Sequence, residues 1–84
     1  MKGYQIIINR SAIKRLQKIQ DPFYLKIKES IYQLAIEPRP AGCKKLKGRE
    51  AYRIRVADFR IIYTVNDSVL IVEVLDLGHR RNIY

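Results

Sequence analysis

Residues 52–63 read YRIRVADFRIIY, and this stretch decides the fold. Apolar and polar side chains alternate on both sides of the pair Ala57-Asp58, which is the pattern of two strands joined by a tight turn. A two-residue turn makes consecutive strands antiparallel neighbours. We therefore expect a β-hairpin with strands at about residues 52–56 and 59–65.

The register of this hairpin divides its side chains between the two faces of a sheet. One face takes the apolar and tyrosine side chains: Tyr52, Ile54, Val56, Phe59, Ile61 and Tyr63. The other face takes Arg53, Arg55 and Arg60, and Arg55 lies directly opposite Arg60. Like charges opposite each other destabilise a sheet by roughly 0.2–1 kcal/mol per pair, so a purely structural purpose explains the cluster poorly. It predicts a site for an anion.

A third strand is expected at about residues 69–77, after the short connection Asn66-Asp67. Its expected register puts Glu73 opposite Arg60. A neutralised ion-pair cluster on the surface is therefore the alternative interpretation of the arginines. Because one carboxylate cannot balance three guanidinium groups, we favour anion binding.

In the first half of the chain the spacing is helical. A short β-branched run at residues 4–8 predicts a strand, and a helix follows from Ser11 to about Ile19. Asn9 and Ser11 are good helix-capping residues. The apolar residues expected on the buried side of this helix are Ala12, Leu16 and Ile19.

A second helix is expected to begin at Asp21-Pro22, with the aspartate as cap and the proline at the first helical position. It ends near Glu37, because Pro38 and Pro40 prevent continuation. Its apolar stripe is Phe23, Ile27, Ile31 and Leu34. The sequence thus predicts one α+β domain over residues 1–84, in the order β-α-α-β-β-β, with a helical hairpin packed on one face of an antiparallel sheet.

Charge is the strongest feature of the composition. The 84 residues include 17 Lys plus Arg against 8 Asp plus Glu, for a net charge of +9. Such a charge predicts a polyanionic or acidic partner. No run approaches the roughly 20 apolar residues that span a bilayer, and the amino terminus lacks the order of a signal peptide. We therefore expect a cytoplasmic protein with no membrane partner.

The chain offers little for metal or thiol chemistry. Cys43 has no second cysteine for a disulfide, and His79 is the only histidine, so no zinc cluster is expected. The acidic residues near the arginines form no evident oxygen cage, and the surrounding cations would repel Mg²⁺. We expect neither a metal nor another cofactor.

RNA scission at a 2′-hydroxyl needs a base for that proton, positive charge for the dianionic phosphorane and an acid for the leaving 5′-oxygen. Arginine supplies the charge in bidentate form. The usual pair of carboxylates or histidines is missing, which leaves His79 and the tyrosines for proton transfer. The tail from Gly78 to Tyr84 adds cations, this histidine and an aromatic hydroxyl directly after the last expected strand.

Four segments, taken in order, resemble the carboxy-terminal signature of RelE-type toxins. They are Lys45-Leu46-Lys47-Gly48, Tyr52-Arg53-Ile54-Arg55-Val56, Asp58-Phe59-Arg60-Ile61-Ile62-Tyr63, and Gly78-His79-Arg80-Arg81 with Ile83-Tyr84. Each segment alone is weak support for the resemblance, but the ordered set in a small basic protein is strong support. The expected order of strands and helices also resembles the RelE-like fold over the whole chain.

The resemblance implies the toxin of a type II toxin–antitoxin system, an endoribonuclease that cleaves mRNA in the ribosomal A site without a cofactor and leaves a 2′,3′-cyclic phosphate. It also implies a RelB-like antitoxin, whose extended and helical segment wraps the toxin. The implied complex is oligomeric and binds DNA through the antitoxin. The expected partners are therefore this antitoxin, the ribosome and mRNA.

The resemblance also implies roles for single residues. Arg60 matches the arginine at the scissile phosphate, Arg80 the arginine that stabilises the transition state or protonates the leaving group, and Tyr84 the tyrosine that acts as base or stacking platform. The strand positions that contact RNA are often lysines in the family and are arginines here, so proton transfer shifts to His79, Tyr84 or the ribosome. The expected catalytic residues are Arg60, Arg80, Tyr84 and His79, and the expected RNA-binding residues are Lys45, Lys47, Arg53, Arg55 and Arg81.

Two alternatives stay open. A ParE-like toxin shares the fold and inhibits DNA gyrase without cutting RNA, but that branch generally lacks the full basic and tyrosine set. An inactive relative would bind phosphates with a strong salt dependence and without scission. Because Arg60, Arg80 and Tyr84 are all present, we favour the nuclease.

Overall fold

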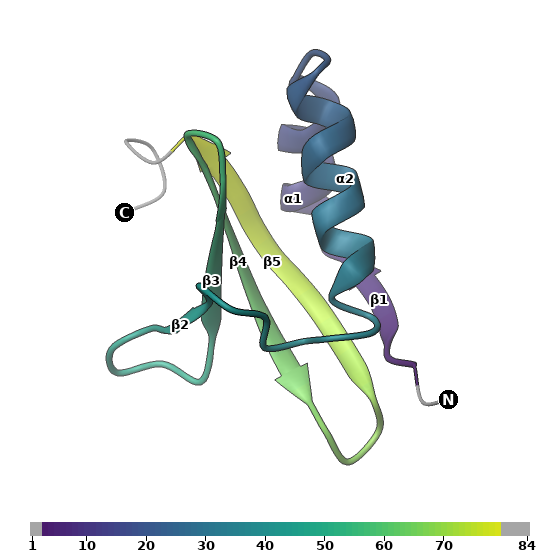
Figure 1. Cartoon of the computed structure of the whole chain (residues 1–84), viewed down its shortest axis with the longest axis vertical. Coiled ribbons are helices and arrows are strands. Elements are labelled where there is room, and N and C mark those ends of the chain that lie inside the picture. The colour runs from purple at the N-terminus through teal and green to yellow at the C-terminus, as the bar shows by residue number, and fades with distance from the viewer. Residues whose placement is uncertain (1–2, 80–84) are drawn as a thin grey trace.

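The computed structural model describes residues 3–79, and its elements follow the expected order with one addition (Figure 1). They are β1 Gln5–Ile8, α1 Arg10–Gln17, α2 Phe23–Gln33, β2 Lys44–Lys45, β3 Tyr52–Val56, β4 Phe59–Asn66 and β5 Ile71–His79. The addition is β2, in a basic stretch where no strand was expected. The α+β class is confirmed.

The strands form one five-stranded sheet in the order β1-β5-β4-β3-β2. The expectation of a purely antiparallel sheet is wrong in one respect, because β1 pairs with β5 in parallel. Short connections force β3, β4 and β5 to alternate in direction, whereas most of the chain separates β1 from β5 and sets no such constraint. The parallel register places Ile6 beside Val72 and Ile8 beside Val74, so that β1 contributes to the core.

The hairpin of β3 and β4 has the expected register. Val56 faces Phe59, and Arg55 faces Arg60. Ala57 adopts a φ of 54°, in the left-handed region that a tight hairpin turn uses. The apolar face of the hairpin packs on the helices, as alternation predicts.

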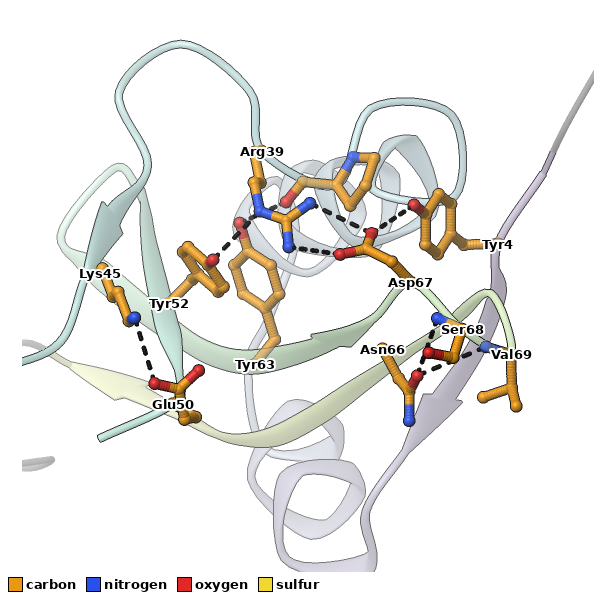
Figure 2. Close-up of polar contacts among 11 residues, drawn as sticks. Tyr4, Arg39, Lys45, Glu50, Tyr52, Tyr63, Asn66, Asp67, Ser68 and Val69 are labelled. Atoms are coloured by element: carbon orange, nitrogen blue, oxygen red, sulfur yellow. Dashed lines mark hydrogen bonds and ion pairs between the residues drawn. The ribbon is translucent and has the colours of Figure 1, made fainter.

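The turn between β4 and β5 is longer than expected. Asn66 pairs with Ile71, so residues 67–70 form the turn instead of the pair Asn66-Asp67. The Asn66 side chain accepts hydrogen bonds from the backbone N–H groups of Ser68 at 3.0 Å and Val69 at 3.4 Å (Figure 2). Because this side chain stabilises the turn locally, the strand after it begins at Ile71.

The longer turn, together with a register shift between Ile62 and Tyr63, gives Arg60 a different neighbour from the one expected. Glu73 faces Thr64, and Arg60 faces Gly78. The prediction that Glu73 lies opposite Arg60 is therefore wrong, since it assumed a two-residue turn. The carboxyl end of β5 lies beside the turn that joins β3 and β4 (Figure 1).

Helix α1 begins at its expected cap, where the Asn9 side chain accepts a backbone hydrogen bond in the first turn at 2.9 Å. Helix α2 differs from expectation at both ends. Pro22 takes the cap position in place of Asp21, and no side chain caps the helix. It ends at Gln33, short of Glu37, because the next N–H groups bond three residues back and tighten the last turn.

Both helices pack on the same face of the sheet (Figure 1). The core lies between the helices and the sheet. It contains Ala12, Leu16, Ile27, Ile31, Leu34, Ile54, Ile61, Tyr63, Val72, Val74 and Leu77. The buried Tyr63 hydroxyl donates a hydrogen bond to the Pro38 carbonyl at 2.8 Å, which satisfies it. Neither helix within residues 3–79 is long and apolar enough to cross a membrane.

Candidate functional site

The face of the sheet that points away from the helices carries a cluster of arginines. Arg55 of β3 lies directly opposite Arg60 of β4, and Arg53 lies opposite Ile62. Side chains that are directly opposite in an antiparallel pair share a face, with Cβ atoms roughly 5 Å apart. Arg55 is exposed, and Arg53 and Arg60 are half-buried. We call the surface formed by Arg53, Arg55 and Arg60 the arginine face.

The two carboxylates of β5, Glu73 and Asp76, form no ion pair with Arg53 or Arg55. Glu73 lies farther along the strand, and Asp76 is ion-paired with Arg15 of α1, at 3.2 Å between Oδ1 and Nε. Within residues 3–79, no carboxylate forms an ion pair with Arg53 or Arg55. The same part of the chain contains no group of three or more His, Cys, Asp or Glu side chains arranged to hold a metal ion.

Strand β2 determines where the neighbouring lysines lie. Lys45 faces Tyr52, and its ammonium lies 3.2 Å from a carboxylate oxygen of Glu50 (Figure 2). Lys47 lies in the exposed turn after β2. Lys44, which was not among the expected site residues, faces Arg53 and therefore shares the arginine face. A strand of two residues shows no detectable alternation, so the sequence gives no signal for this placement.

His79 lies on the opposite face from the arginines. It faces Phe59 across the β4–β5 ladder, and the two rings make an edge contact with centroids 5.9 Å apart. Phe59 in turn contacts Phe23 of α2, with centroids 5.8 Å apart. The structure thus brings the three arginines together and directs the His79 ring toward the helices. The expected site residues Arg80, Arg81 and Tyr84 lie outside the described residues.

A second polar cluster, which the sequence did not indicate, is centred on Arg39 (Figure 2). Its guanidinium bonds both carboxylate oxygens of Asp67, at 2.9 and 3.3 Å, and donates to the Tyr52 hydroxyl at 3.1 Å. The Tyr4 hydroxyl donates to Asp67 at 2.6 Å. Hydrogen bonds from Arg39 and Tyr4 hold the pKa of Asp67 below its usual value, and the bond to Asp67 raises the pKa of Tyr4.

The Arg39 cluster supports the strand that carries Arg53 and Arg55. Arg39 lies over the Tyr52 ring, with Cζ 5.1 Å from the centroid, and Tyr52 stacks on Tyr63 with centroids 5.8 Å apart. Burial raises the pKa of Tyr63, which keeps this side chain neutral in the core. These contacts hold β3 from the helix side, so the arginine face rests on a packed layer.

A cavity of about 530 Å³ lies between α2 and β3. It is lined by Ser30, Gln33, Leu34, Ile36, Glu37, Pro40, Ala41, Gly42, Ile54, Arg55 and Val56. A second hollow on α2 shares Gln33 and Ile36 with it and adds the exposed side chains of Leu25 and Tyr32. Apolar surface of this kind, rimmed by polar groups, is typical of a protein-binding surface.

Comparisons with known proteins point to one family. The family model described as "ParE toxin of type II toxin-antitoxin system, parDE" matches residues 6–84. A Methanocaldococcus jannaschii protein that carries the name RelE1 is 30% identical, and the alignment covers 96% of this chain and 94% of that protein.

Solved structures show the same fold. A chain of the archaeal RelE–RelB complex from Pyrococcus horikoshii superimposes with a TM-score of 0.84 at 30% identity, covering 95% of this chain and 98% of that one. A chain of the E. coli RelBE toxin–antitoxin complex gives a TM-score of 0.78 at 25% identity, with coverage of 90% and 95%. On the family model, the archaeal relative and these structures, the chain belongs to the RelE/ParE superfamily and is a RelE-like toxin of a type II toxin–antitoxin system.

Proposed function

We propose that this toxin is a ribosome-dependent endoribonuclease that cleaves mRNA in the ribosomal A site without a metal and so inhibits translation. The arginine face carries the proposal. Arg55 lies directly opposite Arg60, and no carboxylate from residues 3–79 is ion-paired with Arg53 or Arg55. Guanidinium groups bind phosphates in bidentate form and stabilise the charge that develops on a phosphorane.

Cleavage begins when the RNA 2′-hydroxyl attacks the adjacent phosphorus, and it ends when the 5′-oxygen leaves with a proton and a 2′,3′-cyclic phosphate remains. In the proposed site Arg60 holds the scissile phosphate, and Arg53 and Arg55 hold the backbone and the developing charge. By family resemblance, Arg80 stabilises the transition state or protonates the 5′-oxygen, and Tyr84 acts as base or stacks on a nucleobase.

Further RNA contacts in the proposal come from Lys47 and Arg81. Lys47 lies in an exposed turn next to the arginine strands, and Arg81 is assigned by resemblance. Lys45 joins them only by leaving its ion pair with Glu50.

Among the described residues of the proposed site, few groups are suited to transfer a proton. Arginine stays charged at neutral pH, and the His79 ring packs against Phe59 on the other face of the sheet. His79 acts as base only if its ring leaves that contact. In the proposed mechanism the ribosome holds the 2′-hydroxyl in line for attack, and this alignment compensates for the missing base because it contributes a large share of the barrier reduction. Ribosome dependence is therefore part of the proposed mechanism.

The proposed protein partner is a RelB-like antitoxin. The related structures from Pyrococcus horikoshii and E. coli are complexes of RelE with RelB. On this chain, the cavity between α2 and β3 and the exposed side chains of Leu25, Tyr32 and Ile36 offer apolar anchoring, and the net charge of +9 favours an acidic segment. We propose that the complex is cytoplasmic, oligomeric and DNA-binding through the antitoxin.

Mapping of RNA ends on programmed ribosomes tests the proposed activity. The purified toxin, with EDTA present, is mixed with a defined mRNA either alone or on ribosomes with an empty A site. Cleavage in the A-site codon and little cleavage of naked RNA are expected. Equal cutting of naked and ribosome-bound RNA would contradict the ribosome-dependent mechanism, and absence of cutting in both would contradict the nuclease.

One observation favours a second candidate function. The matching family model is that of ParE toxins, which keeps inhibition of DNA gyrase as the alternative. A gyrase supercoiling assay with the same preparation distinguishes the two, because a nuclease leaves supercoiling unchanged. An inactive RNA-binding relative would bind RNA with a strong salt dependence and produce no new ends in either assay.

A further inference from the structure

Strand β2 places one more cation on the arginine face. Lys44 lies directly opposite Arg53, and the next pair joins Lys45 to Tyr52. Directly opposite residues share a face of the sheet, so Lys44 lies on the same side as the three arginines. Lys44 thereby extends the positive surface from two strands to three.

The placement of Lys44 is fixed by a closed hairpin. After β2 the Leu46 N–H donates to the Ala51 carbonyl at 2.8 Å, which continues the β2–β3 ladder by one more pair. Ala51 is buried, and Gly48 in the connecting turn has a φ of 72°, a conformation that favours glycine. A slip of one residue would turn Lys44 to the other face and would break this set of contacts together.

Lys44 differs from its neighbour in its surroundings. The Lys45 ammonium lies 3.2 Å from the Glu50 carboxylate. Lys44 is exposed, and within residues 3–79 no carboxylate is ion-paired with it. Lys44 opposite Arg53 therefore repeats the like-charge arrangement of Arg55 opposite Arg60, which an anion would relieve.

We propose that Lys44 and Arg53 form a second phosphate-binding subsite for the backbone of single-stranded RNA, next to the subsite of Arg55 and Arg60. Lys44 lies two strands away from Arg60, and the residues that they face on β3 are two positions apart. Their backbones are therefore separated by about 10 Å across the sheet and roughly 7 Å along it. The two subsites therefore hold different phosphates of one strand. This inference rests on the proposed nuclease function.

RNA fits this surface better than an acidic protein segment does. A stable protein interface needs apolar anchors in well-packed pockets. The side chains that β2 and β3 place on this face are Lys44, Arg53 and Arg55, all cationic. The apolar cavity lies between β3 and the helix, and of these three residues only Arg55 lines it. A row of cations without anchors suits a phosphate backbone.

Salt-dependent binding to a fluorescein-labelled oligouridylate tests the second subsite. Each phosphate contact on a single strand contributes about 0.7 to the slope of log binding constant against log salt. We expect Lys44→Ala to lower the slope by about this amount, and Lys44→Arg to keep it. The matched control is Lys26→Ala, which removes one exposed charge from α2 on the other side of the sheet.

The outcomes separate this inference from the proposed function. If Lys26→Ala lowers the slope as much as Lys44→Ala, the effect is one of net charge and the subsite is refuted. An unchanged slope for Lys44→Ala, with cleavage on ribosomes intact, refutes the subsite and leaves the nuclease standing. If Lys44→Ala instead weakens binding of polyglutamate and not of RNA, the surface belongs to an acidic protein. If the wild-type protein neither binds the oligouridylate nor cleaves mRNA, both proposals fail.

Discussion

Arg60 of β4 lies directly opposite Gly78 of β5, so no side chain of β5 stands beside it in this pair. On its other side it faces Arg55 of β3. Across the two ladders, Arg60 therefore has a guanidinium side chain on one side and a glycine on the other. This asymmetry makes Arg60 the first residue to test.

We expect Arg60→Ala to lower single-turnover cleavage on programmed ribosomes by about 10² or more, the effect of losing one preorganised charge donor. The fold should survive, because the side chain lies outside the helix-covered core. Arg10→Ala is the matched control, since it removes the same charge from the exposed start of α1. A folded Arg60→Ala variant that cleaves at the wild-type rate would remove Arg60 from the site.

The sequence predicts the β3–β4 hairpin fully and the next hairpin only in outline. In the first, strict alternation around a two-residue turn allows one register, which sets Arg55 opposite Arg60. In the second, the Asn66 side chain supports a longer turn, and the apolar run that follows fits several registers. The position of Glu73 was therefore not predictable from local pattern.

The residues that support or extend the site are harder to predict than the arginines. Lys44 reaches the arginine face through a strand too short to show a period. The contact of Arg39 with Asp67 joins residues 28 apart in sequence, on two different loops. Such contacts depend on tertiary placement, for which a single sequence carries no local signal.

The Arg39–Asp67 contact should make stability depend on pH in the acid range. The pKa of Asp67 is lowered in the folded state by hydrogen bonds from Arg39 and then Tyr4. A lowered folded pKa means that the stabilisation is complete above the unfolded value, near 3.8, and is lost as pH falls through the folded value. We expect Asp67→Asn to lower Tm at pH 7 and to approach the wild-type Tm below the folded pKa.

Thermal unfolding followed by circular dichroism from pH 7 downward measures this convergence. Asp21→Asn is the control, because Asp21 forms no ion pair within residues 3–79 and should give the wild-type curve. A difference in Tm between wild type and Asp67→Asn that stays constant over the whole range would show that the ionised carboxylate does not stabilise the fold.

If the antitoxin binds in the cavity between α2 and β3, a charged substitution there should weaken its binding. Ile36 lines the cavity and is 69% exposed, so Ile36→Asp should leave the fold intact and place a desolvated charge in the interface. Val69→Asp is the control, since Val69 is 59% exposed in the β4–β5 turn and does not line the cavity. The probe is the protein encoded by the neighbouring open reading frame.

An antitoxin that binds the folded state of the toxin and not the unfolded state stabilises the fold by about 2.7 kcal/mol when it is present at 100 times Kd. A rise in Tm on addition of the antitoxin is therefore expected for wild type and Val69→Asp, and a smaller rise for Ile36→Asp. If Ile36→Asp keeps the full rise, the antitoxin binds elsewhere. If the neighbouring protein does not bind the wild type at all, the proposed partner is incorrect.

Substitution of His79 tests whether this residue is the base that takes the 2′-hydroxyl proton. Its ring contacts Phe59, with centroids 5.9 Å apart, on the face opposite to the arginines. We therefore expect His79→Phe, which keeps an aromatic ring against Phe59, to cleave at the wild-type rate on programmed ribosomes. His79→Ala should lower Tm by removing the contact. A general base contributes typically 10²- to 10⁴-fold, so a loss of that size in a folded His79→Phe variant would identify His79 as the base. That result would require the ring to leave Phe59 when RNA binds, whereas unchanged cleavage assigns the proton to the tail or to the ribosome.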